Sequence, residues 1–153
     1  MKRQLILLAA TLCCALTANA EKKGPVITFE ETDHNFGVFD IYHALQSCYF
    51  KFTNTGDEDL VISDVVPSCN CTVPEYPKYP IAPGESDSIK VSYNGMSRRP
   101  GVFRKIVTID FNGKTVDESF ARITITGEMV DKEVKEQMDE IKEELDKEYK
   151  EPK

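Results

Sequence analysis

The chain has 153 residues, of which 41% are hydrophobic and 29% are charged, and its formal net charge is −7. This composition is typical of a one-domain globular protein with a core, and it excludes collagen-like and low-complexity chains. The negative charge argues against a nucleic-acid partner bound through a basic face and against docking on an anionic membrane.

Residues 1–20 have the pattern of a signal peptide. Lys2 and Arg3 provide a positive start, residues 5–16 form an apolar run too short to span a bilayer, and Ala18-Asn19-Ala20 resembles a cleavage site. Cleavage after Ala20 would remove two positive charges and leave 133 residues with a net charge of −9. We therefore expect an exported protein, periplasmic or secreted, that is not inserted in a membrane after cleavage.

Residues 25–130, which follow a short linker at 21–24, carry the signals of short strands. Cys48, Phe50 and Phe52 alternate with more polar residues, as do Ile89, Val91 and Tyr93. Two further runs rich in β-branched and aromatic residues cover 103–111 and 120–126, with Asn112-Gly113 as the expected turn between them. About seven strands without helical periodicity predict an all-β fold, an immunoglobulin-like antiparallel β-sandwich.

Residues 131–153 are predicted to form an acidic amphipathic helix. Apolar residues recur at spacings of three and four and would form one stripe; they are Val134, Met138, Ile141, Leu145 and Tyr149. The stripe could rest on its own sandwich or form a short coiled-coil homodimer, since about two heptads are present, and a frayed tail is the third alternative.

The cysteines are the only unusual constellation in the chain. Cys69-Asn70-Cys71 forms a Cys-x-Cys motif, and Cys48 lies in an expected strand. In an exported protein these residues are disulfide candidates, either as a small Cys69–Cys71 ring that would be easily reduced or as a staple between Cys48 and one partner. Buried free thiols, a redox-active pair and a soft-metal site remain as alternatives. Because Asn adopts positive φ more often than most residues, we expect Asn70 to form a tight turn that presents both thiols.

Catalytic signals are otherwise weak, and we expect no enzyme and no cofactor. The chain has no Gly-x-Ser-x-Gly turn, no phosphate-binding glycine loop and no His-rich metal signature. His34 would be the extra donor for a metal held by Cys48, Cys69 and Cys71, but a structural, hydrogen-bonded role is the simpler interpretation. His43 and the basic pair Arg98-Arg99 are expected in solvated loops.

These segments together resemble a bacterial family, domain of unknown function 1573, from about residue 29 to residue 127. The resemblance rests on His34-Asn35-Phe36-Gly37, on Ser68-Cys69-Asn70-Cys71-Thr72, and on residues 50–56, 60–62, 81–86 and 101–103. The family pattern has Asp where this chain has Asn35, and Gly where it has Asn70. The family is similar to the immunoglobulin-like sandwiches of the ASPM, SPD-2 and Hydin group and to the major sperm protein fold. The resemblance implies an exported immunoglobulin-like protein and supplies no activity.

The sequence therefore predicts a non-enzymatic, exported module that binds another envelope or secreted protein through a sheet edge or a loop. A structural role in the bacterial envelope is closely related to this hypothesis. The alternative is a thiol-based metal-binding or redox protein that uses the Cys69-Asn70-Cys71 motif.

Overall fold

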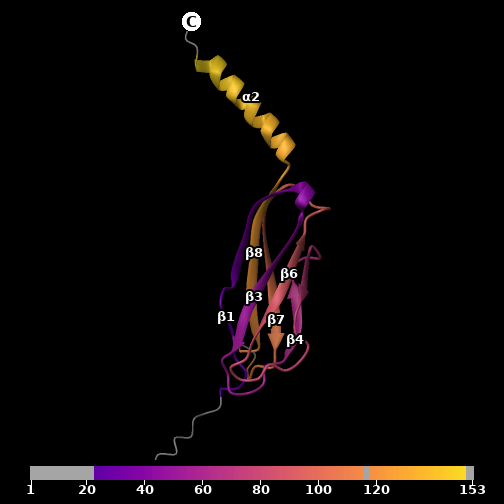
Figure 1. Ribbon diagram of the computed structural model, residues 1–153, viewed down its shortest axis with the longest axis vertical. Helices are drawn as coiled ribbons and strands as arrows, with labels where there is room; N and C mark the ends of the chain where they lie inside the picture. Colours follow the sequence, from indigo (N-terminus) through magenta and orange to yellow (C-terminus); the bar gives the residue numbers. More distant parts are fainter. Residues whose placement is uncertain (1–22, 116–117, 151–153) are drawn as a thin grey trace, which may run out of the picture.

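The computed structural model describes residues 23–115 and 118–150, so the predicted signal peptide at 1–20 lies outside the described residues. The described residues form a two-sheet β-sandwich, and one α-helix projects from an end of it (Figure 1). Within these residues, no helix is both long enough and apolar enough to cross a membrane.

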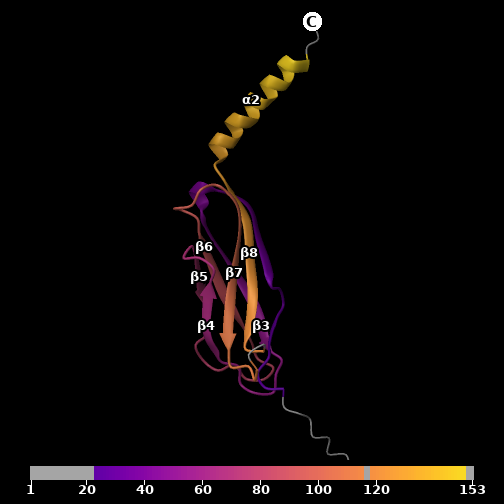
Figure 2. The same ribbon diagram turned by 180° about the vertical axis from the view of Figure 1, so that it is seen from behind.

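Each sheet has four strands. The first sheet has the order β1-β3-β6-β5, with β1 at Ile27–Phe29, β3 at Leu45–Asn54, β6 at Ser86–Asn94 and β5 at Thr72–Glu75. The second has the order β2-β8-β7-β4, with β2 at Asp33–Asp40, β8 at Phe120–Val130, β7 at Gly101–Phe111 and β4 at Ile62–Pro67. Figure 2 shows the molecule from behind, where β4, β5 and β7 are labelled. The sandwich thus has two open edges, one between β1 and β2 and one between β4 and β5.

The alternating patterns fill the core as predicted. Cys48, Phe50 and Phe52 on β3 are buried, and their partners on β6 include Val91 and Ile89. Side chains of β7 and β8 meet them from the other sheet; the fully buried ones are Val107, Ile109, Ile123, Ile125 and Met129. The immunoglobulin-like sandwich predicted from the sequence is confirmed, and its strands fall within the predicted range 25–130.

Some details of the sandwich differ from the prediction. The described residues contain eight strands rather than about seven, and the sequence pattern predicts neither β2 nor β5 as a strand. This strand pairs parallel with β8, whereas the other described strand pairs are antiparallel. The connection from β7 to β8 begins at Asn112-Gly113 but continues to Ser119, so it is longer than the two-residue turn that was predicted.

Helix α2 spans Lys132–Lys150, within the predicted segment. The Asp131 carboxylate caps it by accepting the Val134 N–H at 3.2 Å, and Glu143 pairs with Lys147 at 3.0 Å one turn apart. The apolar stripe of the helix is exposed along its length. Because the helix points away from the sandwich (Figures 1 and 2), the expectation that the stripe rests on its own sandwich is not met.

Candidate functional site

The Cys-x-Cys motif forms the crossing between the two sheets at the β4–β5 edge. β4 ends at Pro67 in one sheet, and β5 begins at Thr72 in the other. Ahead of the motif, the Ser68 N–H donates to the Ile106 carbonyl at 2.8 Å, and behind it the Asn94 N–H donates to the Cys71 carbonyl at 2.8 Å. Each end of the turn is therefore fixed to a different sheet by a backbone hydrogen bond.

Cys69 and Cys71 are joined to each other by a disulfide, with their Cα atoms 5.3 Å apart. The Cys69 side chain is half-buried and the Cys71 side chain is buried. The Cys71 N–H donates to Cys69 Sγ at 3.3 Å, and the Thr72 hydroxyl lies 3.6 Å from the same sulfur. The predicted positive φ at Asn70 is wrong, since none of the described residues other than glycine has a positive φ.

Cys48 and His34 do not join this pair. Cys48 is a free, buried thiol on β3, and since β6 lies between β3 and β5 the two strands are about 10 Å apart. Burial raises the pKa of the Cys48 thiol to about 11. His34 is on β2, at the other edge of the sandwich, with its ring 4.7 Å from that of Phe36. Among residues 23–115 and 118–150, no three His, Cys, Asp or Glu side chains are grouped so that they could hold a metal ion.

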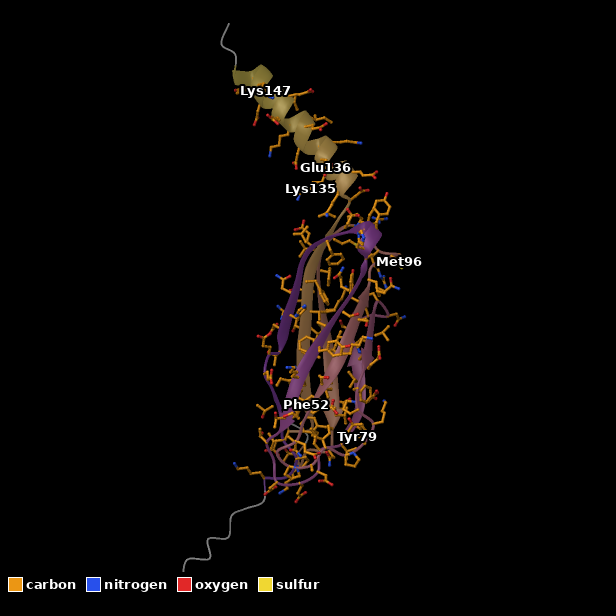
Figure 3. The ribbon with its side chains drawn as sticks, viewed as in Figure 1. Phe52, Tyr79, Met96, Lys135, Glu136 and Lys147 are labelled. Atoms are coloured by element: carbon orange, nitrogen blue, oxygen red, sulfur yellow. A yellow bond between two sulfur atoms is a disulfide. The ribbon has the colours of Figure 1, made fainter. Side chains whose placement is uncertain are left out.

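A groove of about 750 Å³ lies at the end of the sandwich from which α2 projects. Three of its side chains are largely exposed although they are apolar or aromatic: Tyr42 (69%), Leu45 (64%) and Met96 (75%). Figure 3 shows Met96 at this end, beside the short 3-10 helix η1 (Ile41–His43). Among the residues that the structure describes, the groove is lined by Arg98 and His43 and by no acidic side chain, although the chain as a whole is acidic.

Local hydrogen bonds hold the two walls of the groove in place. The Asp40 carboxylate accepts the Tyr42 N–H at 2.9 Å and caps η1. Opposite it, the Gly95 N–H donates to the Ala44 carbonyl at 2.9 Å, and the Met96 N–H donates to the Asn94 side chain at 3.0 Å. The exposed side chains are therefore carried on η1, on the first residue of β3 and on a hydrogen-bonded loop after β6.

The sequence did not identify this groove. Its walls come from residues 41–46 and 95–100, which are far apart in the chain and meet only through the pairing of β3 with β6. Two features of the sequence could have pointed to it. Tyr42 and Leu45 flank His43 in a segment expected to be a solvated loop, and the basic pair Arg98-Arg99 was expected in another one.

The sandwich is similar to known proteins. A family model described as a protein of unknown function (DUF1573) matches residues 27–129. A protein of unknown function from Porphyromonas gingivalis W83 aligns at 14% identity with a TM-score of 0.60, over 74% of this chain and 51% of that chain, so this chain spans about half of that protein. PapD-like domain 7 of human CEP192 aligns at 7% identity with a TM-score of 0.52, over 69% of this chain and 85% of that one.

The E. coli chaperone DraB aligns at 9% identity with a TM-score of 0.47, over 71% of this chain and 56% of that chain. No significant sequence match was found among curated proteins. At these identities, the two similarities with TM-scores above 0.5 show the fold alone. The family model, in contrast, covers most of the chain, and the protein therefore belongs to the DUF1573 family of proteins of unknown function.

Proposed function

We propose that the protein is an exported, non-enzymatic module of the bacterial envelope that binds another envelope or secreted protein in the groove at the helix end of the sandwich. The observation that carries the proposal is the exposure of Tyr42, Leu45 and Met96 around a groove of about 750 Å³. Tyr, Met and Arg are enriched in protein interfaces, and clustered apolar exposure is typical of such surfaces.

A protein segment fits this groove better than a small molecule does. Small-molecule sites bury most of the ligand surface, whereas here the apolar side chains are themselves more than half exposed. Because no acidic side chain lies beside Arg98 in the described part of the lining, a partner segment that carries a carboxylate next to apolar side chains is favoured.

The sheet edges are less suited to binding by strand addition. β1 has three residues, and β5 has four with Pro74 among them. β4 ends in Pro67, and both β4 and β2 contain irregularities in their pairing. Short strands, prolines and bulges are the features that prevent an edge from pairing with another chain. The sequence left an edge and a loop as alternatives, and these features favour the loops.

The test is a pull-down experiment in which the wild type and two variants are used as bait for proteins of the exported fraction. The protein is isolated from the exported fraction, where its intact mass also reports whether cleavage follows Ala20. Leu45→Glu combined with Met96→Glu places charge in the groove, and Val66→Glu is the matched control on edge strand β4. We expect wild type and control to retain the same partner and the groove variant to bind it at least about tenfold more weakly.

The comparison is valid only if all three proteins are folded, so circular dichroism spectra of the wild type, the groove variant and the Val66→Glu control are recorded first. Loss of the partner in the Val66 variant alone would place binding at the β4 edge and contradict the proposal. A wild-type protein that retains no specific partner would contradict it as well.

Helix α2 offers a second contact, with another copy of the same chain. Val134, Met138, Ile141 and Leu145 are exposed and spaced by four, three and four residues, which is the pattern of the core positions in a coiled coil. In an antiparallel pair, the flanking Lys135 and Lys142 would face lysines of the other helix. In a parallel pair, Lys142 faces Gln137 of the other copy, so a parallel dimer avoids the like-charge contact.

A further inference from the structure

The two sulfur atoms of the Cys69–Cys71 disulfide differ in accessibility. Cys69 is half-buried, whereas Cys71 is 4% exposed and belongs to the core. In thiol–disulfide exchange, an incoming thiolate attacks one disulfide sulfur in line with the S–S bond, from the side opposite the other sulfur. Cys69 is therefore the more exposed of the two residues, and an external thiol is expected to attack its sulfur rather than that of Cys71.

The hydrogen bonds around the disulfide are directed at sulfur. Thr72 is 2% exposed, and its hydroxyl has the two sulfurs as its hydrogen-bond partners among the described residues, Cys69 Sγ at 3.6 Å and Cys71 Sγ at 3.9 Å. The Cys71 N–H also donates to Cys69 Sγ, at 3.3 Å. A disulfide sulfur accepts hydrogen bonds weakly and a thiolate accepts them strongly, so both donors are better satisfied when Cys69 is reduced and ionised.

We infer that the Cys69-Asn70-Cys71 turn is a thiol–disulfide exchange site in which Cys69 is the exchanging sulfur. Its substrate class is an exported protein with a pair of cysteine thiols. This inference does not depend on the groove, because it follows from the β4–β5 corner alone.

The exchange proceeds in two steps. An incoming thiol loses its proton, and its sulfur forms a bond with Cys69 Sγ while the Cys69–Cys71 bond breaks. The electron pair goes to Cys71 Sγ, which takes up a proton from solvent. The Thr72 hydroxyl lies 3.9 Å from this sulfur. The second thiol of the partner then attacks the partner's own sulfur and releases Cys69 as a thiolate. The partner dithiol is oxidised to a disulfide, and the protein disulfide is reduced by the same two electrons.

Cys48 takes no part and serves as an internal control. It is buried on β3, and burial raises its thiol pKa to about 11, so it is almost entirely un-ionised near neutral pH. A reagent that modifies Cys69 in the folded protein should leave Cys48 unmodified.

The experiment uses glutathione and needs no substitution in its first arm. The wild-type protein is incubated with reduced glutathione, quenched with acid and analysed by peptide mass mapping. We expect the mixed disulfide at Cys69. A mixed disulfide that forms mainly at Cys71, or at both residues equally, would overturn the inference.

The second arm uses a matched pair of variants treated with oxidised glutathione. Cys71→Ser leaves Cys69 free, and Cys69→Ser leaves Cys71 free. We expect glutathionylation of Cys69 to be at least about tenfold faster than that of Cys71. Equal rates would overturn the assignment of Cys69.

A third measurement tests the role of Thr72 as a positioning residue. In the Cys71→Ser background, Thr72→Val removes the hydroxyl and keeps the shape of the side chain. We expect the pH midpoint of the Cys69 alkylation rate to rise, because the thiolate loses a donor. An unchanged midpoint in a folded variant would show that the hydroxyl does not stabilise the thiolate and would overturn that part of the inference.

Discussion

The free thiol of Cys48 makes the free energy of unfolding depend on pH in the alkaline range. Burial raises its pKa to about 11 in the folded protein, above the value of about 8.5 expected in the unfolded chain. The unfolded state therefore loses this proton first. The contribution of the neutral thiol is complete below about pH 8.5 and is lost as the pH rises through about 11.

We accordingly predict that the free energy of unfolding decreases between pH 8.5 and pH 11, by up to about 3 kcal/mol from this group. Urea unfolding at several pH values measures the slope, and Cys48→Ala is the control, since other groups titrate in the same range. The variant should show a smaller slope than the wild type. Identical slopes would mean that Cys48 ionises as easily in the folded protein as in the unfolded chain.

The residue scale also shows what a sequence pattern can predict. The burial of Cys48, Phe50 and Phe52 followed from alternation, because side chains on a strand point to opposite faces. Asn54, two residues further on, is of a residue type common in turns, yet it is fully buried. Its amide donates to the carbonyls of Glu58 and Ile81, and its oxygen accepts the N–H of Gly56. Those partners are specified by the folded loops, so no local pattern identifies them.

At the scale of elements, the exposed stripe of α2 leads to a prediction about self-association. Ile141→Asn removes an apolar residue from the centre of the proposed parallel coiled coil, and Glu140→Asn makes the same replacement one position away from the stripe. Because the contact covers about two heptads, each apolar side chain is a large part of it. We expect Ile141→Asn to weaken dimerisation at least about tenfold and Glu140→Asn to change it little.

Sedimentation velocity over a range of concentrations measures the dimer directly. Equal dissociation constants for the two variants would contradict a seam at Ile141. A wild-type protein that stays monomeric at the highest concentration would contradict the dimer itself.

Strand β2 illustrates why one element escaped prediction. Its sequence contains Asn35 and Gly37, which are typical turn residues. In the structure Gly37 has φ of 69° and donates its N–H to the Asn35 side chain at 2.8 Å, which forms an irregularity within the strand. The strand continues because β8 pairs with it on both sides of this point, and that pairing is not encoded in the local sequence.

At the scale of the whole molecule, the fold class could be predicted because many short strands and turns leave few alternatives. The site could be predicted only in part. The Cys-x-Cys motif was recognised, but its pairing was left open, because the register of β3, β6 and β5 decides that Cys48 stays apart from the other two cysteines. The groove depends on loops from two strands and was not predicted at all.

The last prediction concerns the stability of the whole fold when the disulfide is reduced. The bond closes a loop of only three residues, so its effect on the entropy of the unfolded chain is small, on the order of 1–2 kcal/mol. The corner is also held by the backbone bonds from Ser68 to Ile106 and from Asn94 to Cys71. We expect reduction to leave the strand content unchanged and to lower the free energy of unfolding by no more than about 2 kcal/mol.

Circular dichroism and urea unfolding with and without a reductant measure both quantities, and the Cys69→Ser, Cys71→Ser double variant should behave like the reduced protein without any reductant. A reduced chain that no longer unfolds cooperatively would make the disulfide a structural staple, whereas a fold that survives reduction is what repeated exchange at Cys69 requires.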